Sequence, residues 1–285
     1  SDLAKRAGQT TGDTVSADVL TIGGSSIDVF AGVNGRTDDA IGLQLNDIAF
    51  GLPLISSKLQ PLRKWTALSA TASSVGLVGL SDLLPTVRNL SVELNQASVA
   101  MDQVVDFSAS NLSVMTGATS SVNLDFDGSA GELLRAEGDV TLQVSDFAYF
   151  SGRIGFEKYA PTNPIKLNNS ITNQQITVPP SPTTSMMAIT GTNITAFVGY
   201  ADGGFDSSKT LVEQQSNLYG FGVDNLDFGV LMSKVAGRSY TAFKARMDDA
   251  RLYGFDPDDF ELSAQDLRFE YNSADTFGNT IDYVD

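Results

Sequence analysis

The chain has 285 residues, a net charge of −16 at pH 7, 42% hydrophobic residues, and neither cysteine nor histidine. This length can bury a core without metals or disulfides, while the missing residues exclude thiolate zinc sites, histidine metal ligands and a Ser-His-Asp triad. The acidic balance argues against nucleic acid and anionic membranes as partners, and without an 18-residue apolar run we expect no membrane insertion.

Strands are the predicted elements along most of the chain after a polar lead-in at residues 1–17, and only 2–7 and 56–64 carry weak helical patterns. Apolar residues alternate with polar ones in short runs such as 43–50, 87–94, 140–147 and 223–228. Period-two alternation predicts strands with one inward face. Ser, Asp or Asn interrupts each run, and such residues can adopt a bend or a left-handed turn. These joints are Ser26, Asp47, Ser74, Asn89, Asn111 and Asp146, then Asn193, Asn225, Asp249 and Asp266.

An internal repeat organises the chain. Residues 22–32 return as 189–199, 42–51 return as 220–229, and 65–70 return as 240–245. Further matches follow in the same order: Gly79 with Gly254, Leu90 with Leu267, Asn95 with Asn272, and Val105-Asp106 with Val284-Asp285. The repeat predicts a first unit at 18–159, a Pro-rich linker or edge segment at 160–185, and a second, incomplete unit at 186–285. We therefore expect the chain to belong to a longer array.

The joints recur at intervals of about 20 residues, which is typical of solenoids built from stacked coils. The sequence therefore predicts an all-β fold of the β-solenoid or parallel β-helix type, in which each rung adds its apolar face to one column. The alternative is a pair of tandem antiparallel β-sandwich modules, because antiparallel meanders produce the same rhythm.

Two acidic clusters are candidate calcium sites. Their residues are Asp125, Asp127 and Glu132 in the first cluster, and Asp256, Asp258 and Asp259 in the second. Carboxylates alternating before glycine offer the oxygen ligands that Ca²⁺ prefers, although neither cluster has the spacing of an EF-hand loop. The alternative is that both are solvated acidic turns, and we expect no other cofactor.

Catalysis is not expected. Paired carboxylates could serve a polysaccharide-cleaving enzyme, but acidic or amide residues recur at matching joints of both copies, as Asp47 does with Asn225, which indicates a structural role. A glycan could instead stack on aromatic side chains. The candidates for such stacking are Tyr149, Phe150, Tyr159, Tyr200 and Tyr253.

Three segments carry a resemblance to a known class of proteins: 65–95, 240–272 and 150–158. They resemble segments of giant repetitive bacterial exported proteins, which are adhesin-like or matrix-like chains of many β-strand repeats. The resemblance covers nearly the whole chain. It implies export, an extracellular or cell-surface location in bacteria, and an adhesive or scaffolding role.

The predicted function is that of a structural or adhesive repeat segment within an elongated stalk or filament. Its expected partners are neighbouring repeats or other copies of the chain, and possible glycans. Three alternatives stay open: a carbohydrate-binding or Ca²⁺-binding extracellular module, a polysaccharide-degrading β-helix enzyme, and a lipid conduit, which an exposed apolar channel would favour.

Overall fold

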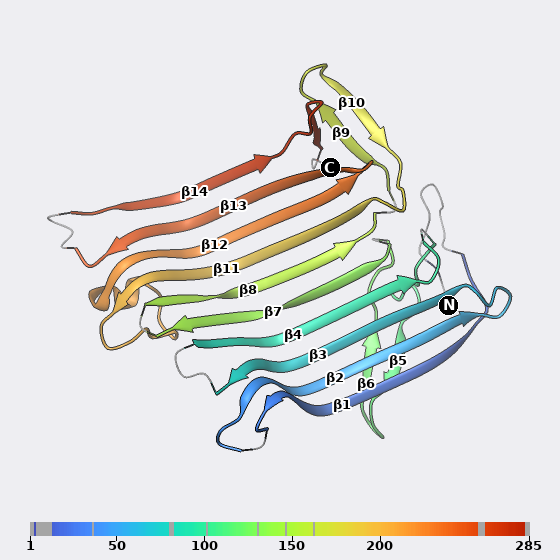
Figure 1. Cartoon of the computed structure of the whole chain (residues 1–285), viewed down its shortest axis with the longest axis horizontal. Coiled ribbons are helices and arrows are strands. Elements are labelled where there is room, and N and C mark those ends of the chain that lie inside the picture. Colours follow the sequence, from blue (N-terminus) through green and yellow to red (C-terminus); the bar gives the residue numbers. More distant parts are fainter. Residues whose placement is uncertain are drawn as a thin grey trace.

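Figure 1 shows a computed structural model of the chain, which describes residue 3 and the stretches 13–35, 37–79, 83–100, 102–129, 131–145, 147–161, 163–255 and 260–282, with the backbone alone at 83–84. Ten long strands lie side by side in one sheet. In spatial order they are β1 (Ala17–Val33), β2 (Ile41–Ser57), β3 (Lys64–Val78), β4 (Leu83–Ala97), β7 (Leu133–Val144), β8 (Ala148–Tyr159), β11 (Ser185–Ala201), β12 (Leu218–Val235), β13 (Arg238–Tyr253) and β14 (Ser263–Asn272).

The all-β class is confirmed, but the parallel β-solenoid is wrong. Every neighbouring pair in the large sheet is antiparallel, so no strand lies on the next as a rung. Val235 pairs with Arg238 across a two-residue turn, Ala236 and Gly237, in which both residues have positive φ. Such a turn joins antiparallel strands, because a parallel crossover needs about a dozen residues or more. The antiparallel alternative fits better, since smaller sheets pack on the large one.

The weak helical pattern at 56–64 is also wrong, because these residues hold the end of β2, a turn and the start of β3. The other pattern, at 2–7, lies outside the described residues except for Leu3, which forms an isolated bridge with Val105. Among the described residues the helical element is the short 3₁₀ helix η1 (Val212–Asn217), in the loop between β11 and β12.

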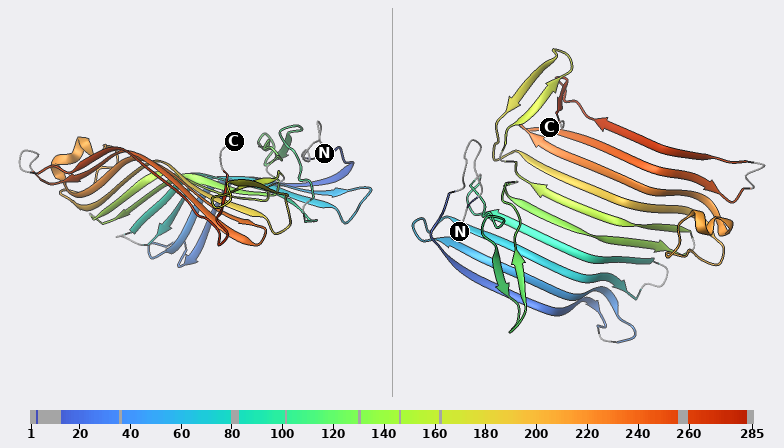
Figure 2. Two further views of the ribbon diagram at one scale, coloured as in Figure 1. Left: turned by 90° about the horizontal axis from the view of Figure 1, so that it is seen from above. Right: turned by 180° about the vertical axis from the view of Figure 1, so that it is seen from behind.

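Three smaller elements pack against the large sheet. A hairpin of β5 (Leu112–Met115) and β6 (Ser121–Leu124) projects from one side of the twisted sheet (Figure 2, left). A three-stranded sheet combines β10 (Gln174–Val178), β9 (Ile165–Asn169) and β15 (Asn279–Ile281). The η1 loop is the third element. Each buries its own apolar cluster against the sheet.

All three clusters lie on the same face of the sheet, here named the covered face. Directly paired residues share a face, and one row of pairs crosses seven strands from Ala67 to Tyr240. The row is Ala67, Asn95, Leu133, Tyr159, Met186, Ser233 and Tyr240. It runs beneath the covers at one end of the strands. At the other end Phe197 pairs with Tyr149, which shares a face with Tyr159 by alternation along β8.

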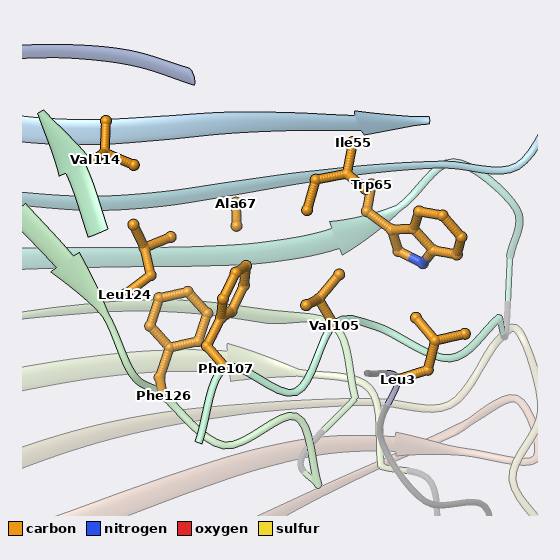
Figure 3. Close-up of a cluster of buried hydrophobic side chains, with 9 residues drawn as sticks. All are labelled: Leu3, Ile55, Trp65, Ala67, Val105, Phe107, Val114, Leu124 and Phe126. Atoms are coloured by element: carbon orange, nitrogen blue, oxygen red, sulfur yellow. The ribbon is translucent and has the colours of Figure 1, made fainter. Parts of the chain in front are cut away.

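The cover over β2, β3 and β4 is the largest cluster (Figure 3). Trp65, the sole tryptophan, is 1% exposed and donates its indole N–H to the carbonyl oxygen of Gln103 (2.7 Å). Phe107 and Phe126 meet edge to face with ring centroids 5.0 Å apart, and Val114 and Leu124 come from the β5–β6 hairpin. The chain thus folds back to cover part of its own sheet.

Six of the expected joints have the predicted left-handed conformation, with φ between 50° and 54°. They are Ser26, Asp47, Asn89, Asn193, Asn225 and Asp266. They do not turn corners, because each lies inside a long strand, where register shifts mark β-bulges at Ser26, Asn89 and Asn193. We name this row across the sheet the bulge line. Ser74, Asn111 and Asp249 do not have positive φ, and Asp146 lies outside the described residues.

The bulge line keeps apolar residues in phase. In β12 the spacing of the apolar residues changes at one point. Strict alternation would place an apolar residue two positions before Leu226, at position 224, but the apolar residue there is Val223, three positions before it. Leu226 pairs with Ile194 and Met247, while Val223 pairs with Ala196 and Ala250. Each bulge adds one residue to its strand, and this residue compensates for the changed spacing. Apolar side chains on both sides of the bulge line therefore stay on the same face of the sheet.

Candidate functional site

The face opposite the covers is apolar across all ten strands, and we name it the open face. One row of directly paired residues crosses the whole sheet with no polar side chain before the edge strand β14. The row is Gly24, Phe50, Ala70, Val92, Ala136, Phe156, Ile189, Val230, Phe243 and Tyr271. Tyr271 brings a phenolic hydroxyl at the edge strand. Beyond the bulge line a second row runs from β4 to β14 through Pro85, Leu142, Phe150, Ala196, Val223, Ala250 and Ala264.

Solvent reaches this face. Among its large apolar side chains, Leu134 is 36% exposed and Val198 is 67% exposed, whereas Phe156, Ile189 and Phe243 are half-buried. Charged residues of the open face gather at one rim, namely Asp18, Lys64, Lys158 and Lys234, as their register partners show. Monomeric soluble proteins rarely expose contiguous apolar patches of more than a few hundred Å², so this face is the candidate interaction surface.

Two equivalent phenylalanine–glycine pairs keep the open face flat. Phe50 lies against Gly24, and Phe228 lies against Gly191, the matching residues of the second copy. A Cβ on Gly191 would come 2.2 Å from the ring of Phe228, so any side chain there would displace the aromatic group. The glycines therefore allow each ring to lie flat on the neighbouring strand.

The middle of the covered face is polar. Arg135 of β7 donates to Glu157 of β8 (2.9 Å) and to Glu93 of β4 (3.1 Å), which lie on either side of it. Burial alone would lower the pKa of Arg135, but the two carboxylates outweigh burial and raise it. Arg153 donates in the same way to Glu137 (2.7 Å) and Asp139 (3.1 Å). Because these half-buried ion pairs still reach solvent, the two networks fix the lateral register of the central strands rather than supplying large stability.

A hollow of about 520 Å³ opens on the covered face beside η1, with Asp224, Asp249 and Arg251 in its wall. Burial raises the pKa of Asp224, and the Asp249 carboxylate adds to this, while the Thr195 hydroxyl (3.2 Å) and Arg251 act against it. Burial, together with Asp224 and Asp249, raises the pKa of the neighbouring Tyr253 to about 12. The Tyr253 hydroxyl and Asp249 Oδ1 are buried without a hydrogen-bond partner among the described residues.

Matching residues anchor the covers in both copies. Asn95 donates to the carbonyl oxygen of Val105 (2.7 Å), and its counterpart Asn272 donates to that of Ile281 (2.9 Å). Two positions before Trp65 and Tyr240 stand Arg63 and Arg238, which bind Asp102 and Asp275. The repeat thus extends from strands to their side-chain anchors. Sequence reasoning noted the two asparagines but missed both arginine–aspartate pairs.

The predicted calcium residues do not converge where the structure describes them. Asp125 and Asp127 are exposed after β6, and Asp127 accepts hydrogen bonds from the amide and hydroxyl of Ser129 (both 2.7 Å). Glu132 is half-buried before β7. In the described part of the chain no three acidic residues gather as metal ligands would. Asp256, Asp258 and Asp259 lie outside the described residues, and calcium binding stays a prediction.

The aromatic residues suggested for glycan stacking divide between faces. Tyr149 and Tyr253 are buried, and Tyr149 stacks on Phe205 with ring centroids 3.9 Å apart, so neither is free for a sugar. Tyr159 is half-buried beside the β9–β10–β15 cover, and Phe150 is half-buried on the open face. Tyr200 is exposed there near Tyr219, with centroids 6.5 Å apart.

The comparisons with known proteins give no relative: no family model, no curated protein and no solved structure matches this chain. No helix among the described residues has the length and apolar character needed to cross a membrane.

Proposed function

We propose that this chain is a structural segment of a larger scaffold, in which repeat units join edge to edge into one continuous antiparallel sheet. The seam between the units supports this. β8, the last long strand of the first unit, pairs with β11, the first strand of the second, from Tyr159–Met186 to Ala148–Val198. The seam is an antiparallel pairing like those within either unit, so the sheet continues from one unit to the next, while the chain between β8 and β11 carries the strands β9 and β10 of a cover.

Such a scaffold grows across the strands. Each added strand lengthens the sheet by about 4.8 Å, and the backbone ladder carries load between neighbours. The function is mechanical, as expected for a stalk or matrix, and it needs no catalytic group. An extracellular location and bacterial origin remain predictions that rest on the resemblance.

The repeat also predicts which strand fits each free edge. In the repeat β14 is the counterpart of β4, and β4 pairs with β7 along the edge that β14 leaves free. Likewise β1 is the counterpart of β11, and β11 pairs with β8 along the edge that β1 leaves free. Glu270 of β14 matches Glu93, which binds Arg135 of β7. Glu270 now meets only the exposed Lys244 (3.0 Å) among its described partners. The free edge of β14 therefore presents the carboxylate that a β7-like strand requires.

An extended chain tests the proposal. A copy of residues 107–159 is appended after Asp285, which supplies new β7-like and β8-like strands. We expect amides of β14 that exchange rapidly in the original chain to become protected, and the sheet to lengthen by about 10 Å in small-angle scattering.

The matched control carries Arg135→Pro and Leu142→Pro in the appended copy only, because proline cannot donate to a ladder. This control should leave β14 exchange as it is in the original chain. Unchanged exchange of β14 in the unmodified extension would refute edge-to-edge joining.

A further inference from the structure

We propose that two copies of this chain pack through their open faces and form a two-layer β-sandwich in solution. This inference concerns the face of the sheet and does not depend on the joining of edges.

The chemistry of the open face fits a protein sheet. Its interior carries aliphatic and aromatic side chains and glycine, and its charged groups stay at one rim. Bulge-line side chains turn to the other face: Asn89 donates to Asp139 (2.7 Å) there, and Asn193 and Asn225 line the hollow beside Asp224. A second apolar sheet would therefore leave few polar groups unpaired.

The shape also favours a flat partner. The described hollows beside Asp224, Glu157 and Ala188 open on the covered face, whereas Phe50 and Phe228 level the open face over Gly24 and Gly191. Small ligands bind in concave pockets, and two apolar sheets pack face to face about 10 Å apart. A second copy of the same face meets this requirement.

The available area exceeds what a stable dimer needs. Ten strands about 4.8 Å apart, each rising about 3.3 Å per residue, give a face of roughly 2,000 Å². Stable interfaces cover about 800 Å² on each partner, so even partial overlap is sufficient. The net charge of −16 on each copy opposes association through long-range repulsion that salt screens, but contact at this face buries few carboxylates, because the acidic residues lie mainly on the covered face, in the loops and at the rim.

The test compares neighbouring residues of β7 on opposite faces. Leu142 pairs with Phe150 on the open face, and Thr141 pairs with Ser151 on the covered face; all four are half-buried. We expect sedimentation equilibrium of the natural chain to give twice the mass of one chain. Leu142→Lys should weaken the dimer at least 100-fold, because it buries an unpaired ammonium group, whereas Thr141→Lys should change affinity less than threefold. Both variants lower the net negative charge equally, so general repulsion cannot explain a difference.

Val198→Lys provides a second probe, since this side chain is 67% exposed and its replacement spares the fold. It should also weaken the dimer, while circular dichroism stays unchanged. A natural chain that is monomeric at every concentration would overturn the proposal, and so would a dimer that resists both open-face variants. Flotation of a monomeric chain with phosphatidylcholine vesicles, abolished by Val198→Lys, would instead assign the face to a lipid surface.

Discussion

Ser26, Asp47 and Asn89 hold φ near +50° inside long strands, a region that an L-residue reaches at a cost of roughly 1–2 kcal/mol. Short polar side chains tolerate this conformation best, and Asn89 also donates across the strand pair to Asp139 of β7. The matching residues of the second copy, Asn193, Asn225 and Asp266, have the same conformation. The sequence signal for each bulge is therefore a small polar residue where the apolar alternation slips.

Ser26 tests the bulge without disturbing a side-chain contact, because it is exposed and φ is 54°. Ser26→Val should lower the free energy of unfolding by about 1–2 kcal/mol, because a β-branched residue is disfavoured at positive φ. Ser26→Gly should be neutral or slightly stabilising. Urea denaturation followed by Trp65 fluorescence measures both, and equal stability of the two variants would contradict a left-handed Ser26.

Asp224 predicts a dependence of stability on pH. Burial raises its pKa in the folded chain above the unfolded value of about 3.9. The charged form is thus disfavoured by folding, so this contribution to stability is fully present below the unfolded pKa and is lost as pH rises through the folded pKa. Asp224→Asn should stabilise the chain at pH 7, and this gain should vanish by about pH 3.

Denaturation of the natural chain and Asp224→Asn between pH 3 and pH 7 measures this difference. Asp202→Asn is the control, because it removes the same charge at an exposed turn and should give a much smaller effect. A gain for Asp224→Asn that is independent of pH would show that burial of the carboxylate is not its cause.

At the scale of elements, the β5–β6 hairpin is held by what it covers. Leu124 is fully buried beside Phe107 and Phe126, whereas Met115 of the same hairpin is 58% exposed. Leu124→Ala should reduce the free energy of unfolding by about 2–5 kcal/mol through lost burial and a residual cavity. Met115→Ala should cost less than about 1 kcal/mol.

Trp65 lies in the same cluster, so its fluorescence reports whether the hairpin still covers the sheet. We expect a red shift for Leu124→Ala at denaturant concentrations where the Met115→Ala chain is still native. Identical unfolding curves for the two variants would mean that the hairpin contributes little to the fold.

The strands and the turns between them also show why the antiparallel direction of the strands was not predicted. Period-two alternation is the same in parallel and antiparallel strands, so the joints and runs could not distinguish a solenoid from a meander. The turn lengths could have done so. Only Ala236 and Gly237 separate β12 from β13, which is too short for a parallel crossover. The interpretation of each joint as a corner divided each long strand into two short ones, so the hairpins between the long strands were not recognised.

At the scale of the whole molecule, one face of a wide sheet is partly covered and the other is bare. Domains normally enclose a core between two layers. Here the chain supplies a second layer at the ends of the covered face, through 107–126, 165–178 and the η1 loop. Where the chain is described, nothing of its own covers the open face. The apolar residues expected to share one column share one surface instead.

The sequence by itself determined the all-β class, the repeat and the left-handed joints at Ser26, Asp47 and Asn89, because backbone preference and alternation are local properties. It also removed cysteine and histidine chemistry. Only the tertiary structure decided that the strands are antiparallel, that the bulges align in one row, and that Phe50, Ile189 and Phe243 belong to a single face. These facts depend on register between strands far apart in the chain, which no local pattern encodes.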